Sequence, residues 1–374
     1  MCSISPRRLC CALILSAFAS VSAGAQAVVA QADLASEEAE AAKELRKALA
    51  RAKASEPFYT APDLFEFKLT TNIRRIRGDK EDKAPWRAAT LSYRDVAAGK
   101  DIEIPTRLRT RGLWRLKNCE FPPLRMNFAS EATEGTLLAG VDRPKLVNFC
   151  ENTDDHEQLI MQEMQLYRIY NVLTPVSHRA RLARITYADS ASGKTHATRM
   201  AIVVEEPEVM AARLGGTLVE IKGATPHDLA ASQDALVSVF QYLIGNTDWS
   251  IFALHNMELV RHENGDHLPI PYDFDFAGAI EAPYATVDPK LRIQRVRQRL
   301  FRGYCHPPED FEKVFSLFNQ KKDAIYALYR DSVGSKLPRR TVDATLKYFD
   351  EFYETINDPR RAKKQILDAC VKVD

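Results

Sequence analysis

Residues 244–260 read IGNTDWSIFALHNMELV, and residues 270–278 read IPYDFDFAG. A run with helical periodicity over 226–245 leads straight into the first stretch. Between the two stretches, the Asn-Gly turn at 262–266 (HENGD) predicts a hairpin of two short strands. A helix end and a tight hairpin therefore bring three carboxylates and two amides to one place, namely Asp248, Asp273, Asp275, Asn246 and Asn256.

Carboxylates gathered in this way repel one another unless a cation lies between them. Mg²⁺ prefers oxygen ligands and usually takes one or two carboxylates together with substrate phosphates. Each residue alone has a simpler explanation, because Asn246 and Asp248 are good helix caps and Asp273 is a good turn residue. For the combination we favour metal-assisted chemistry.

The chain before this region is dominated by strand patterns. Apolar residues from 63 to 205 alternate or form short runs, and a single helical interval at 154–173 has its expected N-cap at Asp154 or Asp155. After the candidate hinge Gly215-Gly216 the pattern is mostly helical, and from Asp288 onward almost entirely so. The order predicts an α+β fold of two lobes, the first β-rich with one helix and the second mainly helical. We expect strands over 65–69, 102–109, 124–128, 145–150, 180–187 and 198–205.

The chain resembles the spore-coat protein H (CotH) kinase-like family in segments that occur in order over most of residues 65–305. The resemblance implies a bilobal protein-kinase-like fold and Mg-ATP-dependent phosphoryl transfer to an unknown protein acceptor. The last two segments are the most specific. The segments are RTRGLWR (Arg109–Arg115), FPPLRMNF (Phe121–Phe128), PKLVNFC (Pro144–Cys150), GNTDWS (Gly245–Ser250) and PYDFD (Pro271–Asp275).

The resemblance also implies roles for the clustered polar residues. Asp248 would orient or deprotonate the acceptor hydroxyl, and Asn256 and Asp273 would hold Mg²⁺ or Mn²⁺ on ATP. Asp275 would add a further carboxylate on the metal side. Two features depart from protein kinases: the interval from Asp248 to Asn256 is longer than D-x-x-x-x-N, and Asp275 stands where kinases have Gly.

The residues expected on the nucleotide side are less clearly marked. The sequence holds no G-x-G-x-x-G loop, so Arg111 would do the phosphate-side work. Lys145 begins the strand before the helix, where a kinase places its phosphate-binding Lys, and Glu163 on that helix is its expected partner. Arg125 on the preceding strand is the rival cation, and Glu205 lies where a kinase hinge meets adenine. The alternatives are a solvated strand end for Lys145 and a solvated helix face for Glu163.

The N-terminal residues and the charge balance bear on location. The 374 residues carry 52 Lys and Arg against 50 Asp and Glu, which excludes a basic nucleic-acid stripe along the whole chain. Residues 1–25 have two Arg, a short apolar run and a small-residue cleavage site, as in a signal peptide, and an uncleaved anchor is the weaker alternative. We expect an exported protein, periplasmic or secreted, with no integral membrane segment after cleavage. The expected parts are the signal peptide (1–25), a polar helical leader (26–56), the N-lobe (57–214) and the C-lobe (215–374).

Signal cleavage would leave four cysteines, which allow three complete pairings. We favour Cys119 with Cys150 because both end nearby strand-like runs. None of the four falls in a C-x-x-C, so a structural zinc is not expected. The remaining two are Cys305 and Cys370.

Three functions are open, ranked in this order. The first is an exported atypical kinase. The second is a non-catalytic protein of the same fold that acts in envelope or surface assembly, since exported compartments generally lack abundant ATP. The third is a metal-dependent phosphoester hydrolase that uses the same carboxylates.

Overall fold

The computed structural model describes residues 36, 39–81, 84–112, 114–262 and 264–373. The expected signal peptide, 1–25, lies outside the described residues. The chain divides into two compact units, Met1–Leu49 and Ala50–Asp374, and residues 39–54 are helical. The domain boundaries expected at residues 56 and 214 stay predictions.

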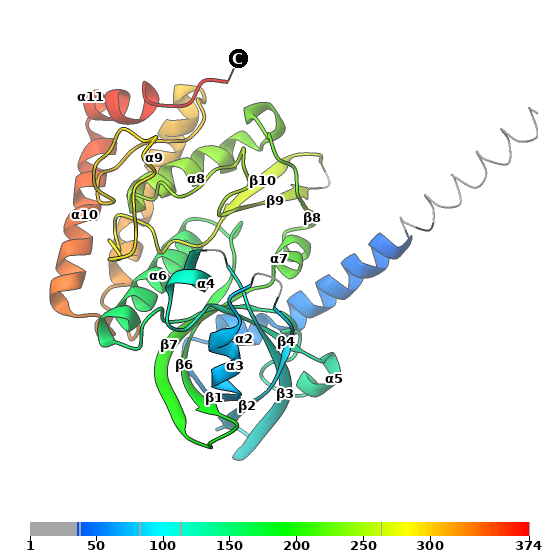
Figure 1. Cartoon of the computed structure of the whole chain (residues 1–374). Coiled ribbons are helices and arrows are strands. Elements are labelled where there is room, and N and C mark those ends of the chain that lie inside the picture. The colour runs from blue at the N-terminus through cyan, green and yellow to red at the C-terminus, as the bar shows by residue number, and fades with distance from the viewer. Residues whose placement is uncertain (1–35, 37–38, 82–83, 113, 263, 374) are drawn as a thin grey trace, which may run out of the picture. The chain divides into compact units, whose positions relative to one another are not determined.

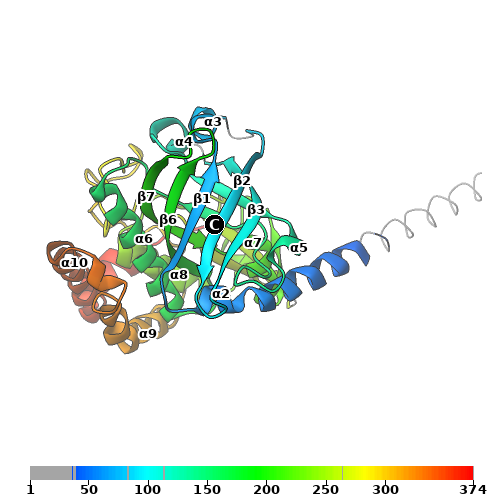
Figure 2. The same cartoon turned by 90° about the horizontal axis from the view of Figure 1, so that it is seen from below.

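The second unit contains a closed β-barrel whose strands follow the order β1-β2-β3-β4-β5-β7-β6. Neighbouring strands are antiparallel except β1 and β6, which run parallel from Phe65 opposite Ala183 to Thr71 opposite Asp189. This parallel pair closes the barrel, and Figure 2 shows β7, β6, β1, β2 and β3 side by side in that order. The strands are β1 (Phe65–Thr71), β2 (Arg87–Asp95), β3 (Lys100–Thr110), β4 (Leu124–Phe128), β5 (Lys145–Val147), β6 (Ala180–Asp189) and β7 (Thr195–Val204).

The barrel interior is a hydrophobic core built by alternation along each strand. In β4, Leu124, Met126 and Phe128 point inward and are buried, while Arg125 and Asn127 alternate with them and are half-buried. The same core takes Phe58 from α2 (Glu56–Thr60). Arg107 and Arg109 of β3 and Arg125 of β4 alternate with buried residues and therefore lie on the outer face of the barrel.

The α+β class is confirmed, but the two-lobed protein-kinase-like fold with a one-helix N-lobe is wrong. The strands close into a barrel, and several helices interrupt them. The pairing of β1 with β6 is non-local and has no signature in either strand's own sequence. The additional helices are too short to show helical periodicity. They are α2, α3 (Ile73–Gly78), α4 (Trp114–Asn118) and α5 (Ser130–Thr133).

The long helix α6 (Asp154–Leu173) has the predicted bounds. Its N-cap is Thr153, whose hydroxyl accepts from the backbone N–H of His156, rather than Asp154 or Asp155. The two aspartates lie in the first turn, where negative charge is favourable to the helix dipole. The apolar face of α6 joins the core of the helical part of the unit.

The helical part follows the barrel strands. The sheet β8 (Gly216–Val219), β9 (Met257–His262) and β10 (His267–Pro271) has the antiparallel order β10-β9-β8. Figure 1 shows α8 beside α9 and α10. The helices are α7 (Pro207–Arg213), α8 (Ala231–Ile244), α9 (Pro308–Ala327), α10 (Arg339–Asn357) and α11 (Pro359–Ala362).

Residues 288–307 are irregular, which corrects the expectation of helix from Asp288 onward. Two arginines of this segment, Arg299 and Arg302, bind backbone oxygens of neighbouring elements instead. The Arg299 guanidinium donates to the backbone oxygens of Tyr242, Leu243 and Tyr348, and Arg302 donates to the backbone oxygen of Trp249 at 2.8 Å. The arginines thus hold the irregular segment against α8 and α10.

Disulfides join Cys119 to Cys150 and Cys305 to Cys370. The first is the pair that the sequence favoured. Among the described helices, none combines the length and the apolar character that crossing a membrane requires.

Candidate functional site

A cavity of about 800 Å³ lies between the outer face of β3 to β5 and the loops that flank β9 and β10. It brings together most of the residues that the sequence singled out. The exceptions are Asn246, Glu163 and Glu205, which are not part of its lining. The predicted residues in the lining are Arg111, Arg125, Lys145, Asp248, Asn256, Asp273 and Asp275.

One wall of the cavity is a row of cations across three strands. Arg109 of β3 pairs directly with Arg125 of β4, and Arg125 pairs directly with Lys145 of β5. Like charges opposite each other destabilise a sheet. Burial and the nearby Arg111 lower the pKa of Arg125, and Arg111 and Arg125 pair with no carboxylate in the described part of the chain. The wall therefore favours a bound polyanion.

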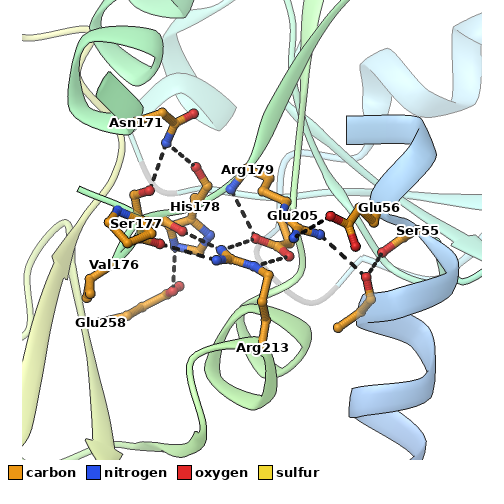
Figure 3. Close-up of polar contacts among 12 residues, drawn as sticks. Ser55, Glu56, Asn171, Val176, Ser177, His178, Arg179, Glu205, Arg213 and Glu258 are labelled. Atoms are coloured by element: carbon orange, nitrogen blue, oxygen red, sulfur yellow. Dashed lines mark hydrogen bonds and ion pairs between the residues drawn. The ribbon is translucent and has the colours of Figure 1, made fainter. Parts of the chain in front are cut away.

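Lys145 has a partner that the sequence did not predict. Its Nζ donates to Glu258 Oε1 at 2.9 Å and lies 3.9 Å from the centre of the Tyr272 ring. Glu258 Oε2 lies 2.7 Å from His178 Nε2, as Figure 3 shows. Burial opposes ionisation of Glu258, but the charges of Lys145 and His178 outweigh it and hold its pKa at about 2. The expected Lys145–Glu163 pair does not form.

The opposite wall begins where α8 ends at Gly245. This glycine has φ +65°, and a Cβ there would collide with the Tyr348 hydroxyl. The turn places the buried Asn246, whose Oδ1 accepts from the backbone N–H of Asp248 at 2.9 Å. The side chain of Asp248 is left partly exposed at the cavity.

The Asp248 carboxylate is held from two sides. His255 Nε2 lies 2.8 Å from Oδ1, and this hydrogen bond raises the pKa of His255. Asn256 Nδ2 donates to Oδ2 at 3.1 Å. Ser250 and His255 exchange two backbone hydrogen bonds of 2.9 Å, so the longer interval before Asn256 forms a compact turn with Phe252 exposed at its tip. The extra residues therefore do not separate Asn256 from Asp248.

Asn256 and Asp273 share an unusual backbone conformation. Their φ angles are +50° and +62°, in the left-handed region, where Asn and Asp are tolerated better than most other residues. The backbone N–H of Asp273 donates to the Tyr167 hydroxyl at 3.1 Å, and Phe274 packs in the core against the Tyr167 ring at 4.7 Å. Strain of this kind collects at functional sites.

Beneath Asp273 lies a buried group of acids and one cation. Burial, and next the charge of Asp273, raise the pKa of Asp275 to about 7, and the Tyr284 hydroxyl donates to Asp275 at 3.2 Å. Glu163 is 1% exposed and accepts from the backbone N–H of Phe274 at 3.4 Å, while burial and then Asp275 raise its pKa well above the usual value. The charge of the buried Arg115 partly offsets both acids. Glu163 thus supports the Asp273 turn rather than Lys145.

The donor set fits a hydrated divalent cation better than a closed metal cage. In the parts of the chain that are described, no three His, Cys, Asp or Glu side chains gather as a ready metal centre. The site offers the carboxylates of Asp273 and Asp275 and the amide of Asn256. Mg²⁺ suits such a set because it takes few protein ligands and completes its sphere with phosphates and water.

Glu205 lies in a different environment from the cavity. Its side chain is fully buried and accepts from Arg213 Nε and Nη2 at 3.1 and 2.8 Å, and from the backbone N–H of Arg179 at 3.0 Å (Figure 3). This arrangement joins α7 to the last barrel strands.

Sequence reasoning missed Glu258, His178 and Arg115. A single signal was present: Glu258 interrupts an otherwise apolar expected strand two residues after Asn256. A scan against protein-family models finds no match, and a search of curated proteins finds none either.

Proposed function

We propose that the cavity binds a nucleoside triphosphate, with ATP as the expected nucleotide, and transfers its terminal phosphoryl group to a hydroxyl of a protein acceptor. The observation that carries the proposal is the row Arg109, Arg125 and Lys145, which lines the same cavity as Asp248 and Asp273. Cations on one wall suit the phosphates. Carboxylates on the other suit a divalent cation and an acceptor hydroxyl.

The phosphate side of the proposal rests on charge and geometry. Arg125 and Arg111 hold planar guanidinium groups with no carboxylate partner among the described residues, and such groups bind phosphate oxygens in pairs. Lys145 adds a point charge whose position is fixed by Glu258. These residues bind and orient the triphosphate and stabilise the charge that develops on the transferred group.

Asp248 is the residue proposed to act on the acceptor. Its carboxylate is partly exposed at the cavity and is oriented by His255 and Asn256. The acceptor oxygen bonds to the γ-phosphorus while the bond from that phosphorus to the bridging oxygen breaks and its electron pair leaves with ADP. The hydroxyl proton passes to Asp248.

Asp273, Asp275 and Asn256 are the residues proposed to hold Mg²⁺ or Mn²⁺. A bound divalent cation would neutralise phosphate charge and fix the position of the triphosphate. The crowding of acids supports this role: burial and then the charge of Asp273 raise the pKa of Asp275, and a cation beside Asp273 would offset the second of these effects.

The motif resemblance supports the same reaction independently of the fold. GNTDWS and PYDFD contribute Asp248 and Asp273 to one cavity, as the CotH kinase-like family implies. We further propose that the protein is exported. Its disulfides, Cys119–Cys150 and Cys305–Cys370, are compatible with an oxidising compartment.

The test is direct transfer. The purified protein is incubated with γ-labelled ATP, Mg²⁺ or Mn²⁺, and acidic, neutral and basic acceptor proteins, beside Asp248→Asn and Asp273→Asn. The proposal expects label on the protein itself or on an acceptor, lost in both variants. Label released only as inorganic phosphate would favour the phosphoester hydrolase. Nucleotide binding without any transfer would favour the non-catalytic protein, and either outcome contradicts the proposal.

A further inference from the structure

We infer that Glu258, held by His178, is a positioning residue that fixes Lys145 for phosphoryl transfer. The inference rests on the proposed function and names the group that takes the place of the expected Glu163. It starts from the contacts of three side chains that come from β5, β9 and the segment before β6.

Each carboxylate oxygen of Glu258 lies close to a side-chain nitrogen. Oε1 accepts from Lys145 Nζ at 2.9 Å, and Oε2 lies 2.7 Å from His178 Nε2. The side chains of Lys145 and Glu258 are 11% and 12% exposed, and that of His178 is fully buried. Glu258 therefore lies between Lys145 and His178 and contacts both of them.

The position of His178 is itself fixed from α6. The Asn171 side-chain amide donates to the His178 backbone oxygen at 2.9 Å and to Ser177 Oγ at 2.8 Å, as Figure 3 shows. The His178 ring also meets the Tyr272 ring edge-on, with centres 6.0 Å apart. Successive contacts thus run from α6 through His178 and Glu258 to Lys145, which belongs to the row of cations. Glu163 takes no part in them.

Tyr272 supplies the other constraint on Lys145. Its ring lies 3.9 Å from Nζ, and it immediately precedes Asp273 in the chain. Glu258 therefore holds the ammonium group over the ring that borders the proposed cation ligand. Phosphoryl transfer depends on such placement, because a small displacement of a stabilising charge costs much of the rate.

If Glu258 positions Lys145, removing the charge of Glu258 should lower the rate of transfer more than the affinity for ATP. In Glu258→Gln, Lys145 keeps its charge but loses its ion-pair partner, and the negative charge beside it is removed. We expect kcat to fall by about tenfold or more while KM for ATP changes by less than about threefold. Glu258→Asp, which keeps the charge on a shorter side chain, should recover part of kcat. Lys145→Met should instead weaken binding of inorganic triphosphate by about tenfold.

A second readout does not depend on activity. Acetylation of lysines by an amine-reactive ester, followed by peptide mass spectrometry, measures the access of Lys145 directly. We expect Lys145 to react several-fold faster in Glu258→Gln than in the parent, and at the parent rate in Glu163→Gln. Glu258→Asp serves as the test variant if Glu258→Gln does not fold, with a smaller increase expected.

The outcomes separate the inference from the proposed function. If the parent transfers phosphate and Glu258→Gln transfers it equally fast, the positioning role is overturned while the proposed function stands. If Lys145 reacts faster in Glu163→Gln than in Glu258→Gln, Glu163 is the partner and the inference is overturned. If the parent neither binds triphosphate nor transfers phosphate, the proposed function itself has failed, and the inference fails with it.

Discussion

The side-chain amide of Asn256 donates to Asp248 twice, to its backbone oxygen at 2.8 Å and to its carboxylate at 3.1 Å. The two residues stand at opposite ends of a turn that Ser250 and His255 close through backbone hydrogen bonds. One residue thus fixes both the backbone and the carboxylate of the proposed acceptor-side group.

The first prediction concerns Asp248→Asn. This variant keeps the shape and the hydrogen bond from Asn256 to the backbone oxygen, but it cannot accept the hydroxyl proton. We expect transfer to fall by about 100-fold or more, with ATP affinity close to that of the parent. Single-turnover transfer and calorimetric titration measure the two quantities. An unchanged transfer rate would remove Asp248 from the reaction.

The second prediction separates charge from backbone strain at Asp273. Asp273→Asn keeps a residue that tolerates φ +62°, so it should melt at or above the parent's temperature but lose the stabilisation by Mg²⁺ with ATP. Asp273→Ala should lose the same ligand effect and in addition about 1 kcal/mol of folding stability. Thermal melts with and without the ligands distinguish the variants. A full ligand effect in Asp273→Asn would contradict the proposed metal role.

The third prediction is that removing the charge of Arg125 raises the stability of the fold and weakens the binding of triphosphate. Its neighbours Arg109 and Lys145 are both cations, so Arg125→Met relieves repulsion and should raise the free energy of unfolding by about 0.5 kcal/mol. The same change should weaken triphosphate binding by about tenfold, and the loss should shrink at high salt. A matched control is Arg94→Met, on the exposed part of β2 outside the cavity lining. If Arg125→Met and Arg94→Met weakened triphosphate binding equally, the proposed role of the cation row in binding would be wrong.

The fourth prediction follows from the lowered pKa of Glu258. A carboxylate with pKa about 2 in the folded protein and an ordinary value near 4.5 when unfolded stabilises the fold above about pH 4.5. This contribution is lost as the pH falls toward 2. Glu258→Gln should therefore be less stable than the parent at pH 7, by about 3 kcal/mol, because it leaves the buried Lys145 without its counter-charge. The difference should narrow at pH 3, as denaturant unfolding would show. A difference in the free energy of unfolding that is the same at pH 7 and pH 3 would contradict the buried Lys145–Glu258 pair.

The sequence predicted those parts of the fold that are local. The bounds of α6 and β4 follow from patterns within each segment, and the Asn-Gly turn predicted the β9–β10 hairpin. Barrel closure was missed because Phe65 and Ala183 pair from distant parts of the chain. The segment 288–307 was misread as helix because two of its arginines, Arg299 and Arg302, do not face solvent but bind backbone oxygens of α8, of α10 and of the loop after α8.

In the candidate site too, the residues in local motifs were predicted and the contacts between distant parts of the chain were not. Asp248 and Asp273 were found because they lie in short, specific motifs that the fold brings to one cavity. The partner of Lys145 was not found, because Glu258 lies 113 residues away and only the folded chain joins them. Glu163 was assigned by analogy with kinases, and the barrel geometry gives its place beside Lys145 to Glu258.

Nucleotide binding in this cavity is tested most simply by a calorimetric titration of the protein with ATP, with Mg²⁺ present and with Mg²⁺ removed by chelation. We expect saturable binding of one nucleotide per chain, which is tighter with Mg²⁺ and weaker in Arg125→Met. Absence of binding under both conditions would contradict the proposed function. Binding that is equally tight in Arg125→Met and unaffected by Mg²⁺ would contradict it as well, because neither the cation row nor the acidic wall would then hold the nucleotide.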